Sequence, residues 1–200
     1  MTKVDLETDL VSLRRTFENI QRLSDASWEQ AKPLFSYQQF NAGEHIFKAG
    51  DVVSNVYFQT SGLTRFYYLH ENGKEFNKSF AAPNQVVSSI FSLVTGKASA
   101  FNVQALTKCN CVSIAYTALL ELARTHADWN RISFSLLELL AIKKEQREAD
   151  FLLLNATQRY ENFKQEYAPI IDSIANYHIA SYLGITEVAL SRIRKRLKLT

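Results

Sequence analysis

The spacing of hydrophobic residues divides the chain into four segments. Over residues 6–34 they recur every three or four positions, which predicts helices. Over residues 35–115 they tend to alternate with polar residues, which predicts strands. The helical spacing returns over residues 116–151 and again from residue 154 onward. We therefore expect an α+β fold in which a β-rich part lies between helical parts.

The first segment has one apolar face and one interruption. The face is formed by Leu10, Leu13, Phe17, Ile20 and Leu23. Residues 24–27 break the spacing, and a short helical turn over residues 28–35 is closed by Pro33. We interpret this segment as helices that pack against and cap the next domain.

Glycines recur at intervals of roughly ten residues through the β-rich segment. They are Gly43, Gly50, Gly62, Gly73 and Gly96. The pair Asn72-Gly73 lies at the centre of a predicted hairpin turn. About eight short strands with this spacing predict a double-stranded β-helix, or jelly roll.

The third segment predicts a helix of about thirty residues, where the mean is about eleven or twelve. Its apolar seam consists of Ile132, Leu136, Leu139 and Leu140. Length and seam together predict a two-fold dimer contact through residues 129–151. The alternative, in which this helix packs only on its own β-domain, remains open.

The last segment predicts one helix followed by two short helices joined by a tight turn. The first helix carries an aromatic face of Tyr160, Phe163 and Tyr167. Gly184 lies where the chain must turn between the two short helices, and Thr186 is a natural N-cap for the second. This arrangement is typical of the helix-turn-helix, whose second helix enters the major groove of DNA.

The last of these helices has two different faces and most of the basic charge. Leu190, Ile193 and Leu197 form an apolar stripe, which leaves the opposite face for polar contacts. Residues 176–200 contain five basic residues and one acidic residue, a net charge of +4. The whole chain is only +3, so the other 175 residues sum to −1. This concentration favours a phosphate-contacting surface, although a basic amphipathic helix would show the same charge.

The composition excludes several other classes of protein. The chain is 46% hydrophobic and 12% aromatic, enough for a sizeable core. We find no secretory signal and no apolar run long enough to span a membrane, so we expect a cytoplasmic protein. Cys109 and Cys111 would share one face of a strand as buried small residues. No catalytic set, metal-ligand spacing or phosphate loop is evident, so we expect neither an enzyme nor a metal site.

Four strings carry a resemblance to a known family. They are FNAGEHIFKAGD at residues 40–51, VYFQTSGLTRFYY at 56–68, LNATQRYENF at 154–163 and IASYLGITEVALSRIRKRL at 179–197. With the order of their segments, they resemble the Crp/Fnr family of bacterial transcription regulators. The resemblance covers about residues 35–198.

The resemblance implies three parts and several partners. The parts are a cyclic-nucleotide-binding-type β-roll sensor with its N-terminal helices (residues 1–116), a dimerisation helix (117–153) and a helix-turn-helix domain (154–200). The implied partners are a second copy of the chain, double-stranded DNA with an inverted-repeat operator, RNA polymerase and an unknown small-molecule effector. No membrane partner is expected.

The effector cassette, which is the segment that binds the cyclic nucleotide in ligand-binding members of the family, departs from the family pattern here. Ligand-binding members use a Gly-Glu pair and then an Arg-Ser pair, whose charged groups bind the ribose and the cyclic phosphate. Alignment places Ser88-Ser89 and Ser99-Ala100 at those positions, with Lys97 as a further phosphate candidate. We therefore expect cyclic AMP and cyclic GMP not to be ligands. Two cysteines are too few for an iron–sulfur member, and no histidine stands out as a haem ligand.

The DNA contacts are predicted from the polar face and the start of the last helix. The predicted set is Thr186, Glu187, Val188, Ser191, Arg192, Arg194, Lys195 and Lys198. Arg192 is the strongest candidate, since its planar fork can bind a guanine edge or a phosphate. Glu187 is explained equally well as a capping residue. The competing hypothesis is a ligand-binding β-roll whose C-terminal helices contact another protein.

Overall fold

The computed structural model describes residues 3–197, so Lys198, one of the predicted DNA contacts, lies outside the described residues. The helices are α1 (Lys3–Ile20), α2 (Asp25–Ala31), the 3₁₀ turn η1 (Lys32–Leu34), α3 (Ile90–Thr95), α4 (Tyr116–Thr125), α5 (Ala127–Leu153), α6 (Ala156–Glu166), the 3₁₀ turn η2 (Ile171–Ser173), α7 (Asn176–Leu183) and α8 (Glu187–Arg196). The strands are β1 (Ser36–Phe40), β2 (His45–Phe47), β3 (Asn55–Ser61), β4 (Thr64–Leu69), β5 (Glu75–Ala81), β6 (Gln85–Val87), β7 (Asn102–Ala105) and β8 (Cys109–Ala115).

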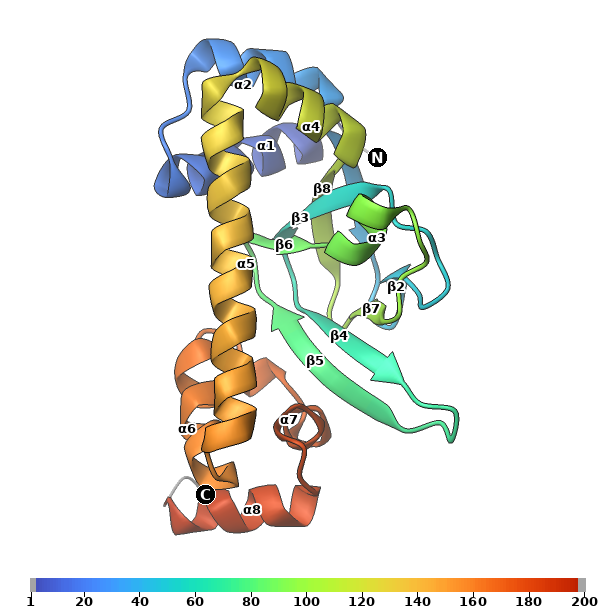
Figure 1. Ribbon diagram of the computed structural model, residues 1–200, viewed down its shortest axis with the longest axis vertical. Helices are drawn as coiled ribbons and strands as arrows, with labels where there is room; N and C mark the ends of the chain where they lie inside the picture. The colour runs from blue at the N-terminus through green and yellow to red at the C-terminus, as the bar shows by residue number, and fades with distance from the viewer. Residues whose placement is uncertain (1–2, 198–200) are drawn as a thin grey trace.

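Helix α5 forms the long axis of the molecule (Figure 1). Helices α1, α2 and α4 lie at one end of it, the β-strands lie along its middle, and α6, α7 and α8 lie at the other end. The predicted α+β architecture is therefore confirmed. Within residues 3–197, no helix combines the length and the apolar character that crossing a bilayer requires.

The β-rich segment forms a jelly roll of two four-stranded sheets, as predicted. Their strand orders are β1-β8-β3-β6 and β2-β7-β4-β5, and all neighbouring strands are antiparallel. Apolar side chains from both sheets fill the space between them, including Phe47, Phe66 and Phe101. Cys109 and Cys111 are free thiols that are fully buried in this core, which confirms their predicted role.

The N-terminal helices cap the β-roll and hold the start of α5. Phe17 packs edge-on against both Phe58 of β3 and Trp129 of α5, with ring centroids 5.0 and 5.2 Å apart. The Asp128 carboxylate accepts hydrogen bonds from the hydroxyls of Ser24 and Ser27 and from the Ser24 N–H. These bonds lower the pKa of Asp128 to about 2. The break predicted near Ser24 is thus the junction that ties α2 to α5.

The predicted single helix after β8 is wrong, because the chain forms two helices that meet at His126. His126 has extended backbone angles (φ −129°, ψ 118°), so α4 ends at Thr125 and α5 begins at Ala127. Leu122 of α4 and Trp129 of α5 belong to the same core cluster. The turn lets both helices place apolar residues in that cluster.

The structure also corrects part of the predicted dimer seam. Ile132 is fully buried in its own chain, and Leu136 packs against the same core. Ile132 is therefore a core residue of one protomer and not a dimer contact. Leu139 and Leu140 are exposed on α5, and their role in a dimer remains a prediction.

Candidate nucleic-acid interface

The turn between α7 and α8 has the local geometry that the sequence predicts. Gly184 has φ +70°, in the left-handed region where a side chain is disfavoured, and its N–H caps the end of α7. The Thr186 hydroxyl accepts a hydrogen bond of 3.2 Å from the Ala189 N–H and so caps the start of α8. Ile185 is partly buried and packs against the core that α7 and α8 share. Helix α8 is therefore fixed at its N-terminal end.

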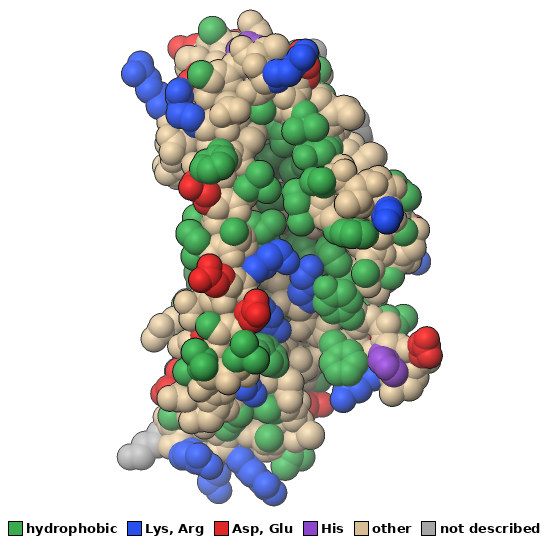
Figure 2. Space-filling view, in the orientation of Figure 1, with side chains coloured by type: hydrophobic (Ala, Val, Ile, Leu, Met, Phe, Trp, Pro, Cys, Tyr) green, Lys and Arg blue, Asp and Glu red, His purple; other side chains and the backbone are tan. Residues whose placement is uncertain are grey.

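Helix α8 buries its apolar stripe and exposes the opposite face. Leu190 and Ile193 are buried in the core of the helix-turn-helix domain, and Leu197 packs against it. On the exposed face, Val188 has 61% of its surface accessible. The exposed polar residues near it are Glu187, Ser191, Arg192, Lys195 and Arg196. Figure 2 shows basic side chains gathered at the end of the molecule where α8 lies.

Arg194 differs from the other basic residues of α8. It is partly buried, its guanidinium donates a hydrogen bond to Asn176 at the start of α7, and its Nε lies inside the domain. Arg194 therefore points toward α7, and its predicted role in contacting DNA is replaced by a contact between the two helices.

A depression beside α8 brings basic residues close to the start of α6. It has a volume of about 560 Å³ and lies between Asn155–Gln158 and α8. Arg192 and Arg196 line it together with Thr157 and Gln158. Basic side chains beside a helix N-terminus form a favourable place for a phosphate group.

Comparison with known proteins connects this arrangement to a family. Residues 37–126 match the family model of the cyclic nucleotide-binding domain. The anaerobic regulatory protein of Haemophilus influenzae is 26% identical over 184 residues, which cover 85% of this chain and 67% of that protein. This similarity covers more of the chain than the 37–126 match does. Residues 37–126 are therefore similar to cyclic nucleotide-binding domains, and most of the chain is similar to a bacterial regulatory protein.

Solved structures show the same fold. FixK2 from Bradyrhizobium japonicum superposes with a TM-score of 0.72 at 18% identity, covering 82% of this chain and 84% of that chain. The global regulator CLP of Xanthomonas campestris, described as responsive to c-di-GMP, superposes with a TM-score of 0.68 at 15% identity, covering 88% and 92%.

The Crp/Fnr effector cassette is occupied here by residues that bond within the chain. The Ser89 hydroxyl caps α3, and the Ser99 hydroxyl bonds the backbone of Phe101, so both are buried and engaged. Ser88 donates to the Asn55 carbonyl. Lys97 and Ala100 are exposed on the turn after α3. The structure therefore does not bring the five effector-pocket candidates together around one ligand.

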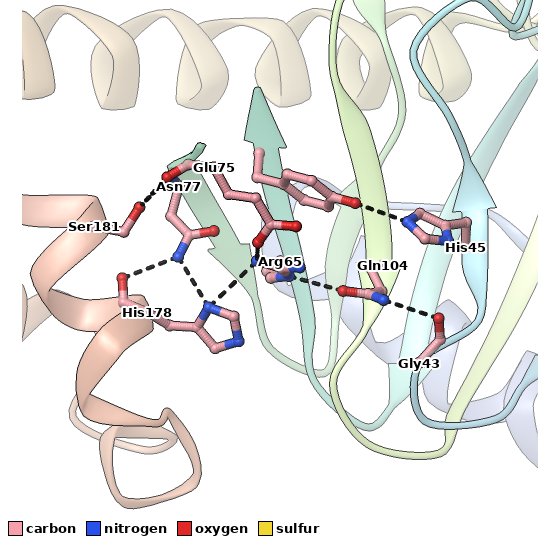
Figure 3. Close-up of polar contacts among 9 residues, drawn as sticks. Gly43, His45, Arg65, Glu75, Asn77, Gln104, His178 and Ser181 are labelled. Carbon is pink, nitrogen blue, oxygen red and sulfur yellow. Dashed lines mark hydrogen bonds and ion pairs between the residues drawn. The ribbon is translucent and has the colours of Figure 1, made fainter. Parts of the chain in front are cut away.

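A polar network that the sequence does not reveal joins the β-roll to the helix-turn-helix domain (Figure 3). The Asn77 side chain on β5 donates to Nδ1 and to the carbonyl oxygen of His178 on α7, at 3.1 and 3.0 Å. The Ser181 hydroxyl donates to the Glu75 carbonyl at 2.9 Å. Arg65 forms an ion pair with Glu75 and also approaches His178. The partners on β5 and α7 are about a hundred positions apart along the chain, so no local pattern predicts these contacts.

His178 is neutral in this network. Its Nδ1 faces the N–H donors of both Asn77 and Arg65 and must accept from them. Burial, and then the nearby Arg65 charge, lower the pKa of His178 to about 4. Protonation of Nδ1 would replace these hydrogen bonds by repulsion between donors. The docking of α7 on β5 therefore depends on an uncharged His178.

Proposed function

We propose that the protein is a dimeric regulator that binds double-stranded DNA through α8 and does not use cyclic AMP or cyclic GMP as an effector. The observation that carries the DNA-binding part is the exposed face of α8. Arg192, Lys195 and Arg196 are exposed there, while the opposite stripe is fixed in the domain core. A helix presented in this way fits the major groove, with basic side chains toward phosphates and base edges.

The dimer is supported by a second apolar face of α5. Phe134 and Leu137 are 62% and 49% exposed, and Ala141 follows at the spacing of a coiled-coil seam. These residues lie on the side of the helix away from Trp129 and Ile132, which are buried. Pairing two copies along α5 would cover this face and present both α8 helices at one end. The operator would then be an inverted repeat with half-sites about 34 Å apart.

The geometry of the cassette argues against cyclic AMP and cyclic GMP as effectors. Neither Ser89 nor Ser99 supplies the charge that the family uses for the ribose and the cyclic phosphate. Both hydroxyls are also committed to the backbone around α3. In a calorimetric titration, we expect no binding of cyclic AMP at micromolar concentration. Micromolar affinity would refute this part of the proposal.

The DNA-binding part is tested with a binding site selected from random DNA. Arg192→Ala should weaken binding to the selected site by about 1–3 kcal/mol. It should also remove the base preference at one position of each half-site of the inverted repeat. Lys195→Ala should weaken binding to selected and random DNA alike. It should also reduce the slope of the logarithm of the binding constant against the logarithm of the salt concentration by about one.

Arg124→Ala is the matched control for these variants. Arg124 is an exposed arginine of α4, at the end of the molecule opposite α8, and its loss changes the net charge by the same amount. It should leave both affinities unchanged. If Arg192→Ala and Lys195→Ala bind DNA as well as this control does, α8 does not contact DNA. The competing hypothesis of a protein contact would then be favoured.

A further inference from the structure

The exposed face of α8 carries one apolar side chain among polar and basic ones. Val188, in the first turn of the helix, has 61% of its surface accessible. Ser191 and Arg192 follow one turn later on the same face, and Lys195 follows them. Within α8, all of which the structure describes, Val188 is the one large hydrophobic side chain that is exposed.

Val188 points away from the core of the helix-turn-helix domain. Leu190 and Ile193 are buried in that core, and Leu197 packs against it. An α-helix turns by about 100° per residue, so Val188 lies nearly opposite the stripe that these three residues form. The first turn is also the part of a recognition helix that contacts base edges. If α8 enters the major groove, Val188 is therefore directed toward the bases.

Folding does not account for a valine at this position. An exposed side chain gains little from burial, and valine is less favourable in a helix than alanine, leucine or arginine. The start of α8 is already capped by the Thr186 hydroxyl, which accepts from the Ala189 N–H. A helical valine strongly prefers one rotamer, so α8 presents the two methyl groups of Val188 in a fixed direction.

One base offers a matching group in the major groove. Thymine presents a C5-methyl group there, whereas the edges of adenine, guanine and cytosine present hydrogen-bond donors and acceptors. A valine cannot bond to these donors and acceptors, and it would shield them from water, which is unfavourable. Against a thymine methyl group, the same side chain gains apolar contact.

We propose that Val188 recognises a thymine in each half-site of the operator through contact with its C5-methyl group. Arg192 and Lys195, on the same face, bind guanine edges or phosphates, so Val188 adds a base preference that depends on no hydrogen bond. This contact requires α8 to lie in the major groove and therefore rests on the proposed function.

DNA duplexes that differ by single methyl groups test this contact. In the duplex selected from random DNA, each thymine is replaced in turn by deoxyuridine, which keeps the hydrogen-bonding groups and lacks the methyl group. At one thymine of each half-site, the replacement should weaken binding roughly fourfold, the effect expected from the burial of one methyl group. Replacement in both half-sites should weaken binding by the product of the two factors, roughly fifteenfold.

Val188→Ser connects the methyl effect to this side chain. Serine and valine have similar helix propensities, so the variant should fold as well as the parent protein. It should bind the thymine duplex and the deoxyuridine duplex with equal affinity, because it offers no apolar contact to the methyl group. Val94→Ser, at a 63% exposed valine of α3, is the matched control and should keep the full methyl effect.

Two results would overturn the proposal while the proposed function stands. One is a duplex bound through Arg192 and Lys195 in which no thymine replacement weakens binding, or in which the half-sites contain no thymine. The other is a methyl effect that Val188→Ser keeps unchanged. If the protein selects no DNA sequence, or if Arg192→Ala and Lys195→Ala do not weaken binding, the proposed function is wrong and the thymine contact is wrong with it.

Discussion

Gly62, at the turn between β3 and β4, offers a quantitative test of the β-roll geometry. Its φ of +86° lies in the left-handed region, where an alanine costs about 1–2 kcal/mol. A Cβ at this position would also lie 2.4 Å from the Lys108 carbonyl oxygen and 2.6 Å from the Cys109 sulfur. Gly62→Ala therefore combines backbone strain with a steric overlap.

The overlap cannot be relieved cheaply, because the surrounding backbone is bonded on several sides. The Gln59 side chain donates to the Gly62 carbonyl, and the Leu106 N–H donates to the Leu63 carbonyl. Cys109 is fully buried and pairs with Phe40 in the sheet. Overpacking of this kind costs about 1–3 kcal/mol. With the backbone term, we expect Gly62→Ala to lower the free energy of unfolding by about 2–5 kcal/mol.

Gly73→Ala is the matched control. Gly73 has φ +81°, but no atom lies within 4 Å of the position that its Cβ would take. Gly73→Ala should lower the free energy of unfolding only through backbone strain, by about 1–2 kcal/mol. The difference between the two variants therefore measures the steric overlap alone.

Urea unfolding followed by tryptophan fluorescence and circular dichroism gives both values. Trp28 and Trp129 are buried in the cluster that joins the N-terminal helices, the β-roll and α5, so their emission reports this part of the fold. The slope of the free energy of unfolding against urea concentration should be the same for both variants and the parent protein, since the surface exposed on unfolding is nearly the same. If Gly62→Ala is as stable as Gly73→Ala, the overlap reasoning is wrong.

The remaining predictions concern assembly, pH and docking. Leu137→Asp should give a monomer in sedimentation analysis, because it would place a charge in the apolar seam of α5. The control Phe91→Asp, at an exposed apolar residue of α3, should leave the protein dimeric. A dimeric Leu137→Asp protein would exclude pairing through this face. The free energy of unfolding should fall as the pH drops from about 6.5 to about 4, because the unfolded chain protonates His178 before the folded chain does. His178→Gln should reduce this part of the pH dependence, and an identical pH profile would show that His178 does not contribute. Asn77→Ala should detach the DNA-binding domain more easily, seen as faster hydrogen exchange in α7, and unchanged exchange would contradict the role of the polar network.

The sequence by itself determined the features that depend on nearby residues. The jelly roll followed from the period-two segments between glycines, and the helix-turn-helix followed from Gly184, Thr186 and the stripe of α8. The inward direction of Leu190 and Ile193 was predictable because a helix with one apolar face must bury that face. These features depend on backbone preferences and on spacing within one element.

Only the tertiary structure decided what each face meets. Periodicity placed Ile132 on an apolar face of α5, but only the fold showed that this face covers its own core while Phe134 and Leu137 stay exposed. In the same way, only the fold turned Arg194 toward α7. Spacing along a chain specifies which residues share a face, whereas the neighbour of that face is set by contacts between residues far apart in sequence.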